Sequence, residues 1–283
     1  MQDLTLGAVF SVKDKTVLVT GGSRGIGKMI ATGFVENGAK VYITARSQED
    51  CEATAADLND LGPGTCCPIP ADLSKQTEVK RLVEELSKKE NVLHVLINNA
   101  GTNWGGRIDE FPDTVFSKVM TLNLQRIFTL TQLCLPLLRA AALAGGIEGQ
   151  AYKDPARVIH IASVNGIKVP VNETYAYTAA KAGLMQLSRH LAGYLAIDGI
   201  TSNSIACGAF STKMMAPLLK TLGEDAVLKQ IPLSRVGSPE DIAGACIYLS
   251  SRAGAYISGA TLAVDGGYLV CKPIIDTQVS AKL

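Results

Sequence analysis

A tyrosine and a lysine four residues apart are the pair of side chains in this sequence best suited to proton transfer. Tyr177 and Lys181 precede a leucine stripe with helical spacing. Residues at i and i+4 share one face of a helix, so the phenol and the ammonium can point into one cleft. A nearby cation lowers the pKa of a tyrosine from about 10, which suits a proton donor at neutral pH. A solvated surface pair would have the same spacing.

Two more polar side chains stand where this chemistry would need them. Ser163 ends an apolar run, where its hydroxyl could hold a substrate carbonyl oxygen or simply close a turn. Asn123 lies four residues after Val119 and four before Ile127, so its amide faces the predicted core. A buried amide without partners costs about 1–3 kcal/mol. We therefore expect a polar network, structural or catalytic, to meet Asn123.

Glycines between the first apolar run and the next helical segment are suited to binding phosphate. Glycine adopts positive φ and lets backbone approach a pyrophosphate at a helix N-terminus. The spacing differs from the familiar G-x-G-x-x-G, and a tight turn that binds nothing would look similar. The residues of this loop predicted to contact a cofactor are Gly21, Ser23, Arg24, Gly25, Ile26 and Gly27.

The end of the second apolar run indicates which dinucleotide would bind. A free ribose 2′-hydroxyl is usually held there by an acid, whereas a 2′-phosphate needs a cation and hydroxyls. The chain offers Arg46 and Ser47, with no acid before Glu49. Arg46 can fork onto phosphate oxygens, and Arg24 could join it. Unless both arginines are simply solvated, this pattern favours NADP (as NADPH) over NAD.

Residues after the third, fourth and sixth apolar runs complete the candidate cofactor site. Asp72 and Leu73 lie where an adenine edge would lie, although a turn or a helix cap would look the same. The small residues of Asn98-Asn99-Ala100-Gly101 allow close backbone approach. Gly208 and Thr212 could meet a nicotinamide carboxamide.

The elements that must position these residues alternate along the chain. The apolar, β-branched runs are Thr16–Thr20, Lys40–Thr44, Cys66–Pro70, Leu93–Ile97, Arg157–Ser163, Thr201–Ala206 and Thr261–Val264. Strands that are apolar on both faces and separated by helices imply a parallel sheet covered on both sides. Such β-α units build a doubly wound α/β (Rossmann) fold. We expect one domain over residues 1–283, with a core of about 14–270 and a flexible tail, 271–283.

Two segments interrupt the alternation. The glycine-rich stretch 144–155 is predicted to be a surface loop. The apolar segment Ala209–Ile231 is predicted to close over a substrate, because the ligand crevice of an open α/β sheet lies beyond the carboxyl ends of its strands. An ordinary amphipathic helix is the alternative. Met214, Met215 and Trp104 point to a hydrophobic substrate.

Composition excludes several classes of protein. Of the 283 residues 47% are hydrophobic and 19% charged, as in a globular protein. The net charge of +1 provides no global field for nucleic acid or anionic membrane. The longest apolar stretches are broken, as by Pro136 and Arg139, before the roughly 20 residues that a membrane span needs. Seven cysteines without a Cys-x-x-Cys spacing predict a reducing intracellular compartment, and no motif indicates a metal site.

Taken together, these motifs resemble the short-chain dehydrogenase/reductase family. The resemblance runs in family order from about residue 14 to 270 and includes Val264-Asp265-Gly266-Gly267. Within the family the chain is most similar to 3-oxoacyl-acyl-carrier-protein reductases. Asn103-Trp104 and Tyr175-Ala176-Tyr177 resemble the rhamnolipid-type ketoacyl reductases.

The resemblance implies a role for each catalytic candidate. Tyr177 would protonate the carbonyl oxygen as hydride arrives from the nicotinamide. Lys181 would bind the nicotinamide ribose and lower the pKa of Tyr177. Ser163 would orient the carbonyl, and Asn123 would hold a water that links Lys181 to solvent. Further cofactor contacts implied by the resemblance are Asp72, Leu73, Asn99, Phe210 and Thr212. The family is usually tetrameric or dimeric, so we expect a homotetramer or homodimer.

The chain departs from the family pattern in three places. Ser163 and Tyr177 are one residue further apart than in many members, which one extra loop residue can absorb. Tyr175 is a rival to Tyr177, but only Tyr177 has a lysine at i+4. Cys207 stands where the family usually has proline before Gly208, which puts a thiol near the nicotinamide.

The C-terminal residues Ala281-Lys282-Leu283 resemble the Ser-Lys-Leu peroxisomal address. They predict recognition by a peroxisomal import receptor and a location in the peroxisome, with the cytoplasm as the alternative.

These observations predict an NADPH-dependent reductase that converts a hydrophobic ketone, such as a 3-oxoacyl group, to a secondary alcohol. The same residues could serve a dehydrogenase of a polyol or steroid-like alcohol. A rival of another class is an NADP-binding sensor or structural subunit without turnover. The complete set of Tyr177, Lys181, Ser163 and Asn123 argues against that rival.

Replacing the cation at the second strand tests the cofactor prediction. We expect Arg46→Asp to shift preference from NADPH toward NADH, because a carboxylate accepts a bond from a free ribose hydroxyl and repels a 2′-phosphate. The ratio of kcat/KM for the two cofactors measures the shift. Unchanged selectivity for NADPH would refute the interpretation of Arg46.

Overall fold

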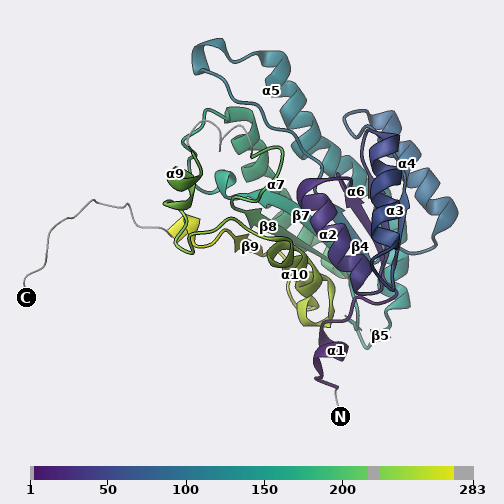
Figure 1. Ribbon diagram of the computed structural model, residues 1–283. Coiled ribbons are helices and arrows are strands. Elements are labelled where there is room, and N and C mark those ends of the chain that lie inside the picture. The colour runs from purple at the N-terminus through teal and green to yellow at the C-terminus, as the bar shows by residue number, and fades with distance from the viewer. Residues whose placement is uncertain (1–2, 216–222, 271–283) are drawn as a thin grey trace, which may run out of the picture.

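A seven-stranded parallel sheet forms the centre of the computed structural model, which describes residues 3–215 and 223–270 (Figure 1). The strand order is β3-β2-β1-β4-β7-β8-β9. The strands are β1 (Thr16–Thr20), β2 (Lys40–Thr44), β3 (Thr65–Pro68), β4 (Val95–Asn98), β7 (Ala156–Ser163), β8 (Ile200–Cys207) and β9 (Thr261–Val264). All seven predicted strands are therefore confirmed, and five of them are within one residue of the predicted ends.

Helices cover both faces of the sheet, as a doubly wound fold requires. One apolar cluster joins the sheet to α2 (Gly25–Glu36), α3 (Gln48–Asn59) and α10 (Pro239–Ser250). A second cluster joins it to α4 (Gln76–Lys89), α6 (Arg126–Ala144) and α7 (Tyr175–Leu195). The shorter helices are α1 (Leu6–Val9), α5 (Asp113–Met120) and α9 (Glu224–Leu228). The predicted fold class is confirmed.

Two strands differ from their predicted ends by two residues. β4 begins at Val95 rather than Leu93, because the Leu93 N–H donates to the Leu137 carbonyl of α6 at 3.0 Å and not to a neighbouring strand. β3 ends at Pro68 rather than Pro70, although the next N–H groups that face β2, those of Ile69 and Ala71, still donate to the Ile43 and Ala45 carbonyls, both at 2.9 Å. The predicted loop 144–155 contains a small hairpin, β5 (Ile147–Glu148) and β6 (Ala151–Tyr152). Two-residue strands carry no periodicity that a sequence could display.

A π-helical turn, Thr121–Gln125, lies between α5 and α6, and no pattern in the sequence predicted it. The helical run Asp113–Ala144 is long and apolar enough to cross a membrane, with a mean hydropathy of 1.6 in its most apolar window. It packs, however, against α4 and β7, and it buries the polar side chains of Asn123 and Thr131. We therefore interpret this run as part of the core.

Parallel strands end at one edge, and this edge collects the candidate residues. The last residues of β1, β2, β4, β7 and β8 are Thr20, Thr44, Asn98, Ser163 and Cys207. Part of the predicted closing segment, residues 216–222, lies outside the described residues. So does the tail 271–283, and the prediction for Ala281-Lys282-Leu283 stays a prediction.

Candidate active site

A cleft of about 1150 Å³ runs along the carboxyl edge of the sheet. Its lining comes from the loops after β1, β2, β3, β4, β7 and β8 and from α7. The predicted site residues all line this cleft except Gly27 and Asn123, which lie behind its wall. The sequence therefore identified residues that the fold brings together from positions up to about two hundred residues apart.

Tyr177, Ser163 and Lys181 meet at one end of this cleft. The phenol of Tyr177, in the first turn of α7, is hydrogen-bonded to Ser163 at the end of β7. The Ser163 Oγ accepts the Asn165 N–H at 3.2 Å, which leaves the serine proton for another acceptor. Lys181 Nζ donates to the carbonyl oxygen of Ile161 at 2.6 Å and lies 5.6 Å from the centre of the Tyr177 ring.

Burial sets the protonation of both groups. It raises the pKa of Tyr177 to about 12, against an opposing effect of the Ser163 hydrogen bond. Burial lowers the pKa of Lys181 to about 8. The prediction that Lys181 lowers the pKa of Tyr177 is not met here, because the ammonium is bonded to the Ile161 carbonyl rather than to the phenol. At neutral pH the site therefore holds a protonated phenol beside an ammonium.

Asn123 meets the polar network that its position predicted. The side chain is completely buried in the π-helical turn. Its Oδ1 accepts the Thr102 N–H at 2.8 Å, and its Nδ2 donates to the Thr102 carbonyl at 2.7 Å. A π turn is often found at a functional site. The amide holds the loop after β4 in place, and its implied role in holding a water stays a prediction.

The glycine loop after β1 has the backbone that a phosphate site needs. Gly21 and Gly25 have φ of +64° and +53°. A Cβ on Gly27 would lie 2.1 Å from the Gly21 carbonyl oxygen, so only glycine fits there. No side chain caps the N-terminus of α2, whose first N–H groups are therefore available to an anion. Asn99 Nδ2 secures the loop by donating to the Thr20 carbonyl at 2.8 Å.

The cleft beyond β2 presents cations, as predicted. Arg24 and Arg46 are exposed, and neither guanidinium makes a hydrogen bond or ion pair with the residues that the structure describes. Ser47 instead caps α3 by accepting the Asp50 N–H at 3.1 Å, and Asp50 itself lines this end of the cleft. Sequence reasoning missed Thr44, whose buried Oγ1 has no partner in the described chain. The feature that could have identified Thr44 is a hydroxyl-bearing residue at the last position of β2.

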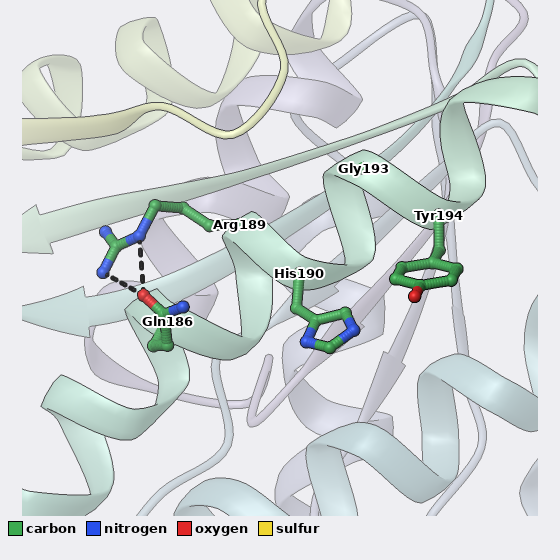
Figure 2. Close-up of a pocket in the computed structure, with 5 residues that line it drawn as sticks. All are labelled: Gln186, Arg189, His190, Gly193 and Tyr194. Atoms are coloured by element: carbon green, nitrogen blue, oxygen red, sulfur yellow. Dashed lines mark hydrogen bonds between the residues drawn. The ribbon is translucent and has the colours of Figure 1, made fainter.

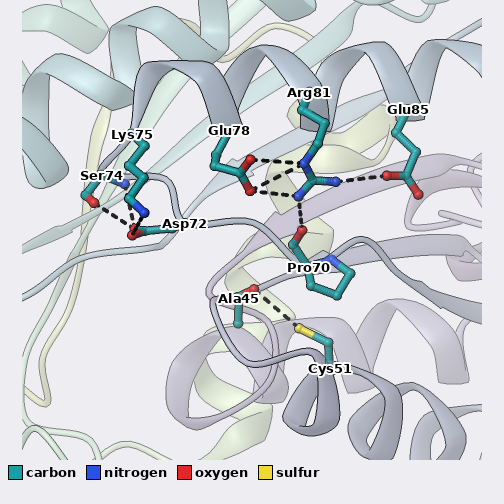
Figure 3. A network of polar contacts seen from close by, with 9 residues as sticks. All are labelled: Ala45, Cys51, Pro70, Asp72, Ser74, Lys75, Glu78, Arg81 and Glu85. Atoms are coloured by element: carbon teal, nitrogen blue, oxygen red, sulfur yellow. Dashed lines mark hydrogen bonds and ion pairs between the residues drawn. The ribbon is translucent and has the colours of Figure 1, made fainter.

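The turn after β3 is held from both sides (Figure 3). Asp72 Oδ1 accepts the Ser74 N–H at 3.1 Å and the Ser74 hydroxyl at 2.7 Å. Burial raises the pKa of Asp72, but these bonds and the charges of Lys75 and Arg46 together lower it. Arg81 of α4 donates to the Pro70 carbonyl and is itself held by Glu78. These bonds fix the backbone that carries Asp72, and the adjoining Leu73 also lines the cleft.

The residues after β8 close the cleft from the opposite side. Gly208 is required because a Cβ would lie 2.7 Å from the Asp265 Cα. Thr212 reaches the N-terminus of α2, with its Cγ2 3.3 Å from the position that a Cβ on Gly25 would take. The Phe210 ring is buried against Gly237 and belongs largely to the core. Burial raises the pKa of the Cys207 thiol to about 12, so this group stays uncharged.

The outer part of the cleft is apolar, as the methionines predicted. Trp104 and Met214 are each about half exposed along it, at 51% and 49%. Met215 lines the cleft beside them. Val227, in α9, and Ile231, just after this helix, also line it. The described part of Ala209–Ile231 therefore covers the cleft, and its closing movement stays a prediction.

A second, shallow depression lies on the outer surface of α7, away from these residues (Figure 2). It is lined by Gln186, Arg189, His190, Gly193 and Tyr194. The Arg189 guanidinium donates to the side-chain amide oxygen Oε1 of Gln186, and the His190 and Tyr194 rings stack with centres 4.9 Å apart. Within residues 3–215 and 223–270, no group of three or more histidine, cysteine or acidic side chains could hold a metal ion.

Comparison with known proteins agrees with this geometry. The family described as enoyl-(acyl carrier protein) reductase matches residues 21–269. The rhamnolipids biosynthesis 3-oxoacyl-[acyl-carrier-protein] reductase of Pseudomonas aeruginosa is 43% identical over 262 residues, which cover 92% of this chain and 98% of that protein. The 3-oxoacyl-[acyl-carrier-protein] reductase of Vibrio cholerae is 34% identical over 260 residues, which cover 91% of this chain and 98% of that protein.

Solved structures give the same result. An active-site complex of the Pseudomonas aeruginosa protein RhlG with NADP has a TM-score of 0.86 and 42% identity, and the match covers 92% of this chain and 98% of that one. A short-chain type dehydrogenase/reductase from Mycobacterium marinum has a TM-score of 0.83 and 27% identity, and the match covers 92% of this chain and 97% of that one. The chain therefore belongs to the short-chain dehydrogenase/reductase family.

Proposed function

We propose that this protein is an NADPH-dependent reductase that converts a ketone to a secondary alcohol. The observation that carries the proposal is the protonated Tyr177 phenol, bonded to Ser163 and backed by Lys181, in a cleft whose other end is a glycine loop. The relatives named above are 3-oxoacyl reductases, and the matching RhlG complex contains NADP, which supports the same assignment.

The described residues fit a phosphorylated dinucleotide. The uncapped N-terminus of α2 and the glycine loop suit a pyrophosphate. Arg24 and Arg46 suit a 2′-phosphate, and the unpaired Thr44 hydroxyl offers a further polar contact beside them. Thr212 stands over the same loop. When bound, NADPH supplies a hydride to the carbonyl carbon of the substrate.

The chain's own residues supply the proton and hold the oxygen. Ser163 donates its hydroxyl proton as a hydrogen bond to the substrate carbonyl oxygen and keeps that oxygen near Tyr177. As the carbonyl carbon gains hydride, Tyr177 transfers its phenolic proton to the oxygen, which completes the alcohol. Lys181, held on the Ile161 carbonyl, stabilises the resulting phenolate by its charge.

The protonation state of Tyr177 is the one from which ketone reduction starts. A phenol with a pKa near 12 is almost entirely protonated at neutral pH. Oxidation of an alcohol would start from the phenolate, which burial disfavours. Together with the 3-oxoacyl reductases named above, this protonation state supports the reduction of a ketone ahead of the dehydrogenation of a polyol or a steroid-like alcohol.

The outer cleft supports an acyl substrate. Trp104, Met214 and Met215 offer apolar contact to a hydrocarbon chain. A polyol would leave this surface without apolar contact and would need more hydrogen-bonding groups there. A 3-oxoacyl group places its ketone near the head of such a chain, and we propose this substrate class.

We also propose that the protein self-associates through the outer face of α7. Tyr194 is 74% exposed there, and Ile197, in the turn that follows, is 82% exposed. Next to Tyr194, Gly193 has no other atom within 4 Å of the position that a Cβ would take, so the backbone is open to close approach. The shallow depression of Figure 2 lies on this face. A homodimer or homotetramer would cover these side chains.

Removal of the phenolic hydroxyl tests the proton donor. We expect Tyr177→Phe to lower kcat for ketone reduction by about 10²–10⁴-fold, the usual contribution of a positioned general acid. Binding of NADPH, followed by fluorescence, should remain. The matched control is Tyr175→Phe, which removes a hydroxyl bonded to Glu173 and should keep kcat near wild type. Full ketone reduction by Tyr177→Phe would refute the mechanism.

The pH dependence tests Lys181. Its pKa is lowered, so the ammonium is present below about pH 8 and is lost as the pH rises through that value. We expect kcat for reduction at saturating NADPH to fall correspondingly above pH 8. In Lys181→Arg the cation persists to pH 10, so the residual rate should not fall. A wild-type profile that stays flat between pH 6 and 10 would contradict the role of the ammonium.

A charge on the outer face of α7 tests self-association. We expect Tyr194→Glu to shift the mass measured by light scattering toward the monomer, because a buried, unpaired carboxylate opposes an apolar interface. Leu61→Glu, at an exposed position in the turn after α3, is the control and should leave the mass unchanged. A wild-type protein that is monomeric at micromolar concentration would exclude the proposal.

A further inference from the structure

The proposed mechanism leaves one buried titratable side chain unused. His160 lies on β7 next to Ile161, whose carbonyl holds Lys181, and its side chain is completely buried. Its ring is hydrogen-bonded on both sides. Nδ1 lies 3.3 Å from Asn98 Nδ2 on β4, and Nε2 lies 3.3 Å from Ser202 Oγ on β8. The imidazole therefore braces β7 between its two neighbouring strands.

The bonds of this imidazole extend into α7. Ser202 Oγ lies 3.0 Å from Ser188 Oγ, and Ser188 is two turns after Lys181 along α7. Lys181 Nζ returns to β7 through its 2.6 Å bond with the Ile161 carbonyl. A closed loop of contacts thus runs from Lys181 through β7, His160, Ser202 and Ser188 back to α7. Both partners of the Lys181–Ile161 bond therefore belong to this closed loop of contacts.

The ring is neutral, which lets it stand close to an ammonium. Asn98 Nδ2 is a donor, so Nδ1 of the ring accepts, and the ring proton lies on Nε2 and is donated to Ser202. Burial and the nearby Lys181 lower the pKa of His160 to about 3. The side chains that bond to the ring or continue its network from β4, α6, β8 and α7 (Asn98, Thr131, Ser202 and Ser188) are all uncharged. Among the described residues, Lys181 is the only charged group that acts on the ring.

We propose that His160 is a positioning residue that holds the Ile161 carbonyl against Lys181 Nζ. Its neutral ring fixes β7 to β8 and, through the two serines, to α7, so the ammonium stays buried beneath Tyr177. Only the predicted effect on catalysis rests on the proposed function. The position and protonation of Lys181 exist without any substrate.

The test removes both hydrogen bonds and keeps the volume, by His160→Leu. A lysine no longer tethered to Ile161 turns toward the water of the cleft, so its pKa should rise from about 8 toward the ordinary 10.5. The pKa is measured in the cofactor-free protein from the pH dependence of Lys181 acetylation, by mass spectrometry. We expect kcat for ketone reduction to fall about tenfold, as for a misplaced catalytic group. The pH above which kcat declines should become higher, in step with the pKa of Lys181.

Two further variants separate positioning from general loosening of the core. Ser188→Ala breaks the same loop at α7 and should raise the Lys181 pKa as well, with no further rise in the double variant with His160→Leu. Thr131→Val removes a buried hydroxyl that contacts Asn98 but lies outside the loop, and should leave the pKa unchanged. If His160→Leu does not fold, Ser188→Ala carries the test.

The outcomes distinguish this inference from the proposed function. The positioning role is overturned if the pKa of Lys181 is the same in His160→Leu and Ser188→Ala as in the control Thr131→Val. A wild-type protein that reduces no ketone would instead overturn the proposed function, while the acetylation measurement would still report on His160. A raised pKa in both loop variants, with the control unchanged, supports the inference.

Discussion

The site depends on one buried cation for which the structure provides no counter-ion. Lys181 Nζ is bonded to a backbone carbonyl at 2.6 Å, and within the described chain no carboxylate forms an ion pair with it. A buried ammonium without a counter-charge is costly, and here the cost appears as a pKa lowered to about 8. The neighbouring thiol of Cys207 adds no charge, since burial holds its pKa near 12. The ammonium is therefore available to a negative charge that forms during the reaction.

A parallel sheet is what makes this arrangement possible. Every strand ends at the same edge, so the glycine loop, Asn99 and Ser163 face one cleft although they come from distant parts of the chain. Cys207 extends this order at the end of β8. It retains an N–H and stays in register with Ser163 and Val264, so β8 remains a full strand up to Gly208. Cys207 therefore leaves the backbone at the end of the cleft regular.

The sequence predicted the strands well because they are apolar on both faces, as the fully buried β1 and β7 show. It predicted the cleft residues because their types and order along the chain are specific. It could not predict features set by tertiary contact. The π turn at Asn123 and its pairing with Thr102 depend on the loop after β4, and the Phe210 ring is buried by the approach of Gly237. The pKa of Tyr177 depends on burial, which no spacing reveals.

The same burial that raises the pKa of Tyr177 lowers that of Lys181, and the two shifts act together in the reaction. Before proton transfer the phenol is neutral, and the ammonium 5.6 Å from its ring centre gains little from it. After transfer the phenolate and the ammonium form an ion pair in surroundings of low polarity, where their attraction is strong. The charge interaction thus develops only as the proton leaves, which lowers the energy of the transition state more than that of the bound ketone. Firm placement of Lys181 on β7 is needed for this difference, because an ammonium free to enter water would interact more weakly with the phenolate.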